Sequence, residues 1–466
     1  MKRCVIIEYR TVPCFLAALL AALAIALHAP GQLSYDSVTQ LYEASIGRSV
    51  SWNPPFMSAM LAWLGGGTVA SSVFVALNAC ATYGAFVIVI RSAPAISATR
   101  ALFCSIVLTN PVVFAYVGIV WKDVLFASWA VLTFATCLAA QRTQSTSVRF
   151  ALVALAAIFL GVGALIRQQG VFMAPIFLLA PLGIVWSTWR RARRIQLIVV
   201  SALLFVVAWA VTGQLVNRTI GGNDGRAMAA APAIVQTFDI AGMVVRMSTP
   251  DAMATFPGLT ADDDKQIRER YVPDRVDFLA IPTLKPDLLR AAGGQSLTPV
   301  WLNGIKTHPM AYVRHRVSSI MSLLDLRDIN KCLPIQVGVE GAAEYLEHLN
   351  LRAESSARAR FLYSKLRTMF AYPVWRNWLY VAIMAIVTGI LLFKRNGVAG
   401  PTRLVVWVYL LAMWVFLASF LPTTIACDFR YLYPIIPLIT AILLTLFSRS
   451  GDRYDKAPLA AESARV

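Results

Sequence analysis

The sequence predicts an all-helical protein that crosses a membrane about ten times, and composition and hydropathy carry this prediction. Of the 466 residues, 58% are hydrophobic and only 14% are charged, whereas an average soluble domain is about 25% charged. The mean hydropathy is +0.64. This composition excludes a disordered chain, a collagen-like chain and a small secreted fold that depends on disulfides.

Apolar stretches recur along the chain, and a helix needs about 20 such residues to cross the hydrocarbon core. Pro and Gly interrupt several of them, which neighbouring helices tolerate in a membrane. The predicted spans are Val12–Ala29, Val69–Ile90, Ala101–Ile119, Val124–Ala140, Phe150–Ile166, Val171–Trp186, Ile195–Thr212, Trp378–Phe393, Leu404–Leu421 and Tyr431–Phe447.

The net charge of +18 follows the predicted topology. Basic residues collect in alternate loops, as in the run from Arg190 to Arg194, and such loops stay on the cytoplasmic side. We therefore expect both termini inside and no nucleic-acid partner.

Pro30 after Ala29 disfavours cleavage of residues 1–30 as a signal peptide, so we expect an uncleaved first helix. The Ala- and Arg-rich, Lys-poor composition suits a bacterial inner membrane with a periplasmic outer face.

Four regions are expected: an N-terminal transmembrane module (1–212), a large, mainly helical outer domain (213–376), C-terminal transmembrane helices (377–450) and a cytoplasmic tail (451–466). Thr260 followed by three acids predicts a capped helix in the outer domain. Cys332 and Cys427 are the two cysteines expected outside, where they could pair or stay free.

Charged residues collect at the outer ends of the predicted spans, which argues against an ion path through the bilayer, where intramembrane acids would be expected. A cavity at the outer face would gather them. They are Asp36, Glu43, Arg48, Lys122, Asp123, Arg167, Asp428 and Arg430.

Two surface helices are expected in the first outer loop. In Ser34–Gly47, Asp36, Gln40 and Glu43 recur at helical spacing, and Asp36 could simply cap this helix. Pro54-Pro55 can begin a second helix that the following glycines end.

Structural interpretations remain open for the other charges. Lys122-Asp123 could be a solvated loop, Arg167 could reach the lipid headgroups, and Asp428 with Arg430 could form an isolated ion pair.

The order of these motifs resembles the GT-C superfamily of integral-membrane glycosyltransferases, which includes protein mannosyltransferases and lipid A aminoarabinose transferases. The resemblance rests on Tyr35-Asp36-Ser37, Asn53-Pro54-Pro55-Phe56, Lys122-Asp123, Arg167-Gln168-Gln169-Gly170 and Arg430-Tyr431-Leu432-Tyr433-Pro434. The sequence departs from many members at Ser37, where they carry a second acid, and in having one acid in the second outer loop.

The resemblance implies a sugar donor carried on a polyprenyl phosphate and a glycan, lipid or protein acceptor at the outer face, with membrane lipids around the chain. It implies catalytic roles for Asp36 and Asp123, with Asp36 as the base of an inverting displacement. Lys122, Arg167 and Arg430 would bind the donor phosphate. Asp36 and Asp123 would hold a divalent metal such as Mg²⁺ or Mn²⁺, if one is used. The residues expected to contact sugar or acceptor are Tyr35, Gln40, Glu43, Trp52, Asn53, Gln168 and Tyr433.

Other functions remain open at this stage. A membrane O-antigen ligase or polymerase would have a similar layout but would rely on outer-face arginines. A transporter or flippase of lipid-linked sugars would place its polar groups near the midplane and show paired repeats, neither of which is found. A non-enzymatic scaffold would leave Asp36, Asp123 and Arg167 without a reason to gather.

Overall fold

The computed structural model describes residues 9–93, 96–221, 226–294, 296–326, 332, 334–393 and 400–448, so the predicted tail (451–466) lies outside it. Within these residues the regular structure is helical, and β-pairing is limited to isolated bridges. The predicted all-α membrane fold is confirmed.

Among the described residues, seven helices are long and apolar enough to cross a membrane. They are α1 (Thr11–His28), α4 (Gly67–Arg91), α7 (Lys122–Arg142), α8 (Thr146–Gly163), α9 (Gly170–Thr188), α10 (Arg191–Thr219) and α20 (Gly400–Ser419). Three predicted spans are shorter apolar helices: α5 (Ala98–Leu108), α19 (Asn377–Phe393) and α21 (Ile435–Phe447).

The predicted span Ala101–Ile119 is divided into two helices, α5 and α6 (Pro111–Tyr116). Asn110 caps α6, since its side chain accepts from the Val112 amide at 2.9 Å. Pro111 occupies the first turn, and a residue before proline avoids the helical conformation. Hydropathy alone therefore overestimated the length of this helix.

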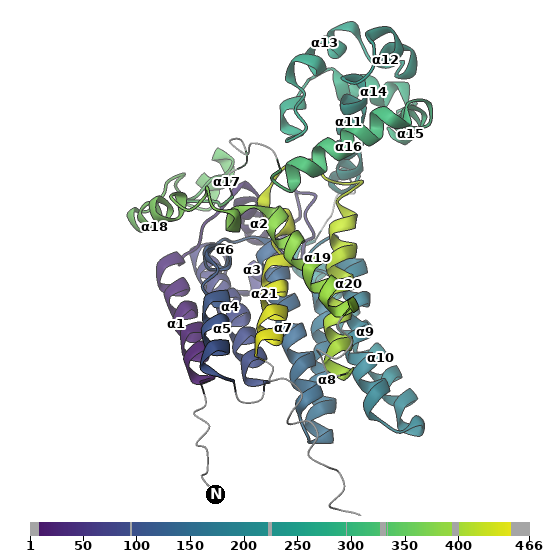
Figure 1. Ribbon diagram of the computed structural model, residues 1–466. Helices are drawn as coiled ribbons and strands as arrows, with labels where there is room; N and C mark the ends of the chain where they lie inside the picture. The colour runs from purple at the N-terminus through teal and green to yellow at the C-terminus, as the bar shows by residue number, and fades with distance from the viewer. Residues whose placement is uncertain are drawn as a thin grey trace, which may run out of the picture.

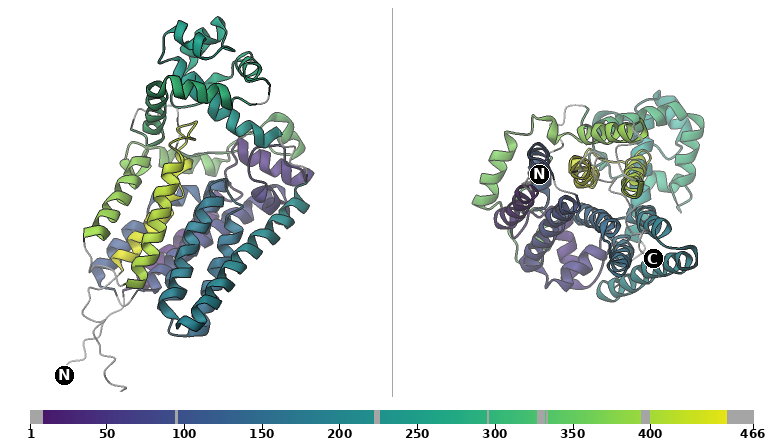
Figure 2. Two further views of the ribbon diagram at one scale, coloured as in Figure 1. Left: turned by 90° about the vertical axis from the view of Figure 1, so that its right-hand side faces the viewer. Right: turned by 60° about the horizontal axis from the view of Figure 1, so that its bottom comes forward.

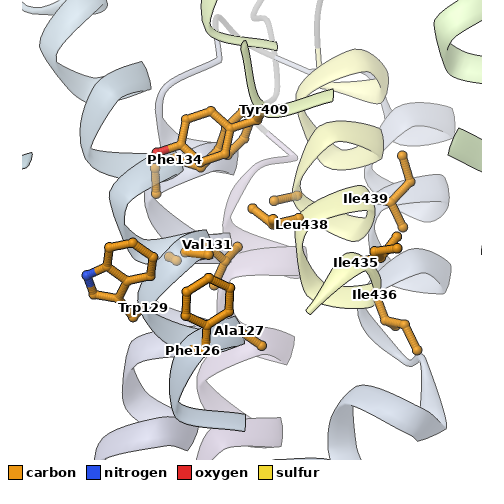
Figure 3. Close-up of a cluster of buried hydrophobic side chains, with 14 of the residues drawn as sticks. Phe126, Ala127, Trp129, Val131, Phe134, Tyr409, Ile435, Ile436, Leu438 and Ile439 are labelled. Carbon is orange, nitrogen blue, oxygen red and sulfur yellow. The ribbon is translucent and has the colours of Figure 1, made fainter. Parts of the chain in front are cut away.

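Helix α7 lies at the centre of the bundle. Of the 18 residues in its most apolar stretch, 83% are buried, whereas only 6% of the corresponding residues of α10 are buried. Figure 3 shows side chains of α7, including Phe134, beside Tyr409 of α20, with Leu438 of α21 facing α7. Because α10 exposes apolar side chains such as Leu203 and Val207, its surface is suited to lipid.

Further helices lie at the upper end of the bundle, where α1 ends and α7 begins (Figures 1 and 2). The upper domain (α11 to α16) stands above α20, whereas α17 packs on α2 and α18 on the upper end of α1. Its helices are α11 (Arg226–Val244), α12 (Thr249–Thr255), α13 (Ala261–Arg270), α14 (Leu284–Ala291), α15 (Thr298–Thr307) and α16 (Pro309–Leu323); α17 is Ala343–His348 and α18 is Ala357–Arg367. Short 3₁₀ turns are η1 (Asp277–Leu279), η2 (Pro373–Trp375) and η3 (Phe429–Leu432).

Both predicted surface helices are present, as α2 (Tyr35–Ile46) and α3 (Phe56–Trp63). The cap of α2 is Ser34, not Asp36: Ser34 and Ser37 exchange side-chain and backbone hydrogen bonds in a capping box. Asp36 is therefore free for another role. Ser37 also donates to the Val120 carbonyl at 2.6 Å, which fixes α2 beside the start of α7.

In the upper region one expectation holds and one open alternative is decided. The helix predicted after Thr260 is α13, with a capping box between Thr260 and Asp263. Cys332 and Cys427 form a disulfide with Cα atoms 6.0 Å apart. Their pairing connects the segment after α16 to the loop that precedes α21.

Asp325 follows α16, and its burial predicts that the stability of the folded protein depends on pH. Its side chain is 5% exposed, and burial raises its pKa to about 7, although the carboxylate accepts from the Asn377 amide. The folded state therefore binds this proton more tightly than the unfolded state, so stability falls as pH rises from about 4 to 7. Asp325→Asn should raise the melting temperature at pH 8.5 and leave it nearly unchanged at pH 4. An equal gain at both values would contradict this account.

Candidate active site

A cavity of about 540 Å³ lies where the upper end of the bundle meets the upper domain. Its charged lining residues are Asp36, Lys122, Asp123, Arg167 and Arg430. They come from four places in the chain: the first turns of α2 and α7, the turn between α8 and α9, and η3 before α21. The structure thus brings together the five residues to which the sequence assigned catalysis and phosphate binding.

Asp36 and Arg430 form an ion pair, with 2.6 Å between Oδ2 and Nη1. Burial opposes ionisation of Asp36 and is the largest single influence on its pKa. The charges of Arg430 and Lys122, together with hydrogen bonds from Arg430 and Asn53, outweigh burial and hold the pKa of this carboxyl below its usual value. Asp36 is therefore a carboxylate at neutral pH. Arg430 also reaches Asp428 through its other terminal nitrogen at 3.3 Å, so the predicted Asp428–Arg430 pair exists but is not isolated.

Arg167 and Asp123 form a second ion pair, in which both side chains are almost fully buried. The guanidinium lies 5.3 Å from the centre of the Phe416 ring and 5.6 Å from that of Phe420. Arg167 therefore does not reach toward lipid headgroups. Gly170 allows this turn to close, because a Cβ there would lie 2.9 Å from two backbone carbonyl oxygens.

Lys122 begins α7, and its ammonium donates to the side-chain oxygen of Asn53 and lies 5.2 Å from the centre of the Trp52 ring. Gln168 donates to the Trp52 carbonyl at 3.4 Å. Trp52 and Gln168 line the cavity, whereas Asn53 lies behind Lys122. Lys122 is thus held against the first outer loop and is not a solvated loop residue.

A second cavity of about 650 Å³ shares the Asp36–Arg430 pair with the first. Its other lining side chains are mostly polar, including Tyr35, Arg275, Asp277, Gln336 and Glu340. The first cavity, by contrast, has apolar walls from Phe172, Ile234, Val235, Phe420 and Ile425. Asp36 therefore lies between an apolar, cationic cavity and a polar one.

Four predicted contact residues line neither cavity, and one of them is Asn53, which binds Lys122. Glu43 is fully buried, and its carboxylate accepts from the Val50 and Ser51 amides and the Ser58 hydroxyl at 2.6 to 2.8 Å. It thus shapes the first outer loop instead of facing a ligand. Gln40 is buried in α2, and Tyr433 is buried with its ring stacked on Tyr116. Helical spacing placed Gln40 and Glu43 near Asp36 but could not show which face of the helix is buried.

The sequence interpretation missed the wall that the upper domain adds to the first cavity. Gln236 of α11 and Trp301 of α15 line it, together with Thr423 and Ile425 of the loop after α20. Gln169 also lines it and accepts from Arg167 Nε at 2.9 Å. Only the last of these had a sequence signal, because it is adjacent to the Arg167 motif.

The lining residues do not fit a divalent metal. Asp36 and Asp123 are each bound by an arginine, and three cationic side chains surround them. In the part of the chain that the structure describes, no group of three or more His, Cys, Asp or Glu side chains is arranged to hold a metal ion. We therefore derive no step through the metal that the sequence resemblance implied.

Fold and site together define an integral membrane protein with a charged cavity at one end of its helical bundle. No protein-family model matches the sequence, and no curated protein matches it. Solved structures do show similarity. The oligosaccharyltransferase AglB from Archaeoglobus fulgidus, in complex with an inhibitory peptide and a dolichol-phosphate, is 12% identical, with a TM-score of 0.41 over 93% of this chain and 50% of that chain.

ArnT from Cupriavidus metallidurans bound to undecaprenyl phosphate is also 12% identical, with a TM-score of 0.36 over 93% of this chain and 77% of that chain. The chain thus spans about half the length of the oligosaccharyltransferase. Both proteins are GT-C glycosyltransferases, the class that the sequence motifs resemble. At this identity and TM-score, the likeness carries no conclusion about activity.

Proposed function

We propose that the protein is a glycosyltransferase that moves a sugar from a polyprenyl-phosphate carrier to an acceptor at the periplasmic face of a bacterial inner membrane. One observation carries the proposal: Asp36, a carboxylate, lies between an apolar cavity with three basic residues and a polar cavity. A transferase of this kind needs a site for a lipid phosphate and a site for an acceptor that meet at a base.

The first cavity suits the donor. Lys122, Arg167 and Arg430 supply the positive charge that a phosphate needs, and arginine binds phosphate oxygens in a bidentate manner. Phe172, Phe420 and Pro422 supply an apolar surface for the first isoprene units. Within the bundle these groups lie at one end, as expected for a headgroup held at the membrane surface.

Asp36 suits the base. The acceptor hydroxyl oxygen attacks the anomeric carbon and its proton passes to the Asp36 carboxylate. The bond between that carbon and the phosphate oxygen breaks, and the leaving polyprenyl phosphate keeps the electron pair. Cationic side chains stabilise this charge. A single displacement inverts the anomeric configuration.

Arg430 links binding of the donor phosphate to the basicity of Asp36. In the free protein it is bound to Asp36 and Asp428, which keeps Asp36 ionised but weakly basic. A donor phosphate competes for the same guanidinium, and withdrawal of Arg430 from Asp36 raises the basicity of the carboxylate. Donor binding thus prepares the base for the acceptor.

The second cavity suits a hydroxylated acceptor, because its wall offers hydrogen-bonding groups and the exposed Tyr35 ring. Glycans, glycolipid headgroups and proteins all carry such hydroxyls. Placement of the acceptor here favours a transferase over a flippase, which has no need of a carboxylate between two cavities.

A transfer assay in liposomes tests the proposal. Purified protein supplied with polyprenyl-phosphate sugars and membrane extract should form glycosylated acceptor and free polyprenyl phosphate in equal amounts. Movement of the intact lipid-linked sugar across the bilayer, without its cleavage, would instead favour a flippase.

Metal removal gives a separate prediction. Because arginines occupy both carboxylates, transfer measured in excess EDTA should stay within about twofold of the untreated rate, since guanidinium and ammonium groups replace the electrostatic role of a metal. An activity that EDTA abolishes and Mg²⁺ or Mn²⁺ restores would contradict this prediction.

A further inference from the structure

A buried carboxylate in the upper domain joins the segments that close the first cavity. Three such segments contribute lining residues: α11 through Gln236, α15 through Trp301, and the loop 420–425 through Thr423 and Ile425. They are distant in sequence and belong to three separate elements of the fold. Figure 1 shows α11, α15 and α16 stacked above the upper end of α20.

Asp239, one turn after Gln236 on α11, binds one residue of α15 and one of α16 through one oxygen. Its Oδ2 accepts from Trp301 Nε1 at 2.8 Å and from Arg316 Nη2 at 2.6 Å. Arg316 then donates through Nη1 to the Thr424 carbonyl at 2.8 Å. A chain of three hydrogen bonds therefore runs from the cavity residue Trp301, through Asp239 and Arg316, to the loop 420–425.

The other oxygen of Asp239 faces α16. His315 Nε2 lies 3.1 Å from Oδ1, and His315 Nδ1 lies 2.8 Å from the Tyr271 hydroxyl. With its hydrogen on Nε2, the ring directs that hydrogen toward the Asp239 carboxylate and leaves Nδ1 to accept from the Tyr271 hydroxyl. Gly242 makes room for this ring, because a Cβ there would lie 2.0 Å from His315 Nδ1. Asp239 and His315 are both fully buried.

We infer that Asp239 is a positioning residue for donor binding, because its carboxylate fixes Trp301 and the loop 420–425 against the first cavity. The inference rests on the proposed function, which places the donor phosphate and its first isoprene units in that cavity. Asp239 itself does not line the cavity. It acts through Trp301 and through Arg316. The loop that it fixes continues to Arg430, which is six residues after Thr424.

The test compares Asp239→Asn with Asp263→Asn. Asp263 is an equally buried carboxylate of the upper domain, but it binds only Thr260 and Thr283 within α13 and its neighbourhood. Binding of undecaprenyl phosphate to the full chain in detergent is measured first. Asp239→Asn should raise Kd by about tenfold, equivalent to ~1.4 kcal/mol, while Asp263→Asn stays near the wild-type value.

Kinetics and hydrogen exchange separate positioning from general destabilisation. With a polyprenyl-phosphate sugar, Asp239→Asn should raise KM for the donor about tenfold and change kcat and the acceptor KM less than about threefold, the pattern of lost ground-state binding. Backbone amides of α15 and the loop 420–427 should exchange faster in Asp239→Asn than in Asp263→Asn.

A milder variant keeps the test decisive if Asp239→Asn does not fold. Trp301→Phe retains an aromatic ring at the cavity but removes the hydrogen bond to Asp239. It should weaken lipid-phosphate binding about threefold, which corresponds to the low end of the net value of a typical intramolecular hydrogen bond. If the wild type binds lipid phosphate and both variants bind it with the same affinity, the inference is overturned and the proposed function stands. A wild-type protein that binds no lipid phosphate would overturn the proposed function and the inference together.

Discussion

Asp36→Asn should lower kcat for sugar transfer by about a thousandfold, within the range attributed to a general base. Asparagine has nearly the same shape and can still accept from Arg430, but it cannot take the proton of the acceptor hydroxyl. Because Asp36 is partly exposed, with 29% of its side-chain surface accessible, the variant should fold and bind undecaprenyl phosphate at least as well as the wild type. Turnover of labelled donor in liposomes measures the effect.

Asp428→Asn is the matched control for Asp36. It removes a carboxylate from the same guanidinium, at 3.3 Å, without removing the proposed base. We expect its kcat to stay within about tenfold of the wild type, a smaller loss than that of a general base. Equal losses in the two variants would assign both acids to the positioning of Arg430 and remove Asp36 from the role of base.

Arg167→Ala should have the second large effect, on both stability and donor binding. It leaves the Asp123 carboxylate buried without a partner, and the loss of one member of a buried ion pair costs about 3–5 kcal/mol. It also removes a cation from the first cavity. Melting temperature and undecaprenyl-phosphate affinity should both fall, and donor binding should weaken more than acceptor binding.

The double variant Arg167→Ala with Asp123→Asn separates these two contributions. It removes the unpaired charge, so most of the lost stability should return, because replacing both members of a buried pair is often nearly neutral. Lipid-phosphate affinity should stay low. Recovery of affinity together with stability would mean that Arg167 has only a structural role.

Hydropathy and charge placement were enough to predict the helical bundle and the end of it that holds the site. The predicted span Ala101–Ile119 was too long, because backbone chemistry at Asn110-Pro111 overrides hydropathy. The sequence left open whether Asp36 caps its helix, and the structure gives that role to Ser34. Both points concern competition between neighbouring residues for the same backbone groups, which a hydropathy window does not register.

The five charged residues of the first cavity were predicted, because charge at the end of an apolar span is conspicuous. Their partners were not. Asp36 and Arg430 are 394 residues apart in sequence, and nothing local indicates that they pair. The wall from Trp301 and Gln236 was missed for the same reason: an aromatic and an amide in a polar domain look ordinary until the fold places them above the cavity.

The most direct test of this account is a structure of the full chain with undecaprenyl phosphate. We expect density for the phosphate in the first cavity, within hydrogen-bonding distance of Arg430 and Lys122, with the isoprene chain against Phe172 and Phe420. Arg430 should then have moved from Asp36 toward the phosphate. A lipid phosphate bound elsewhere on the protein, with the Asp36–Arg430 pair intact and the cavity empty, would contradict the central claim.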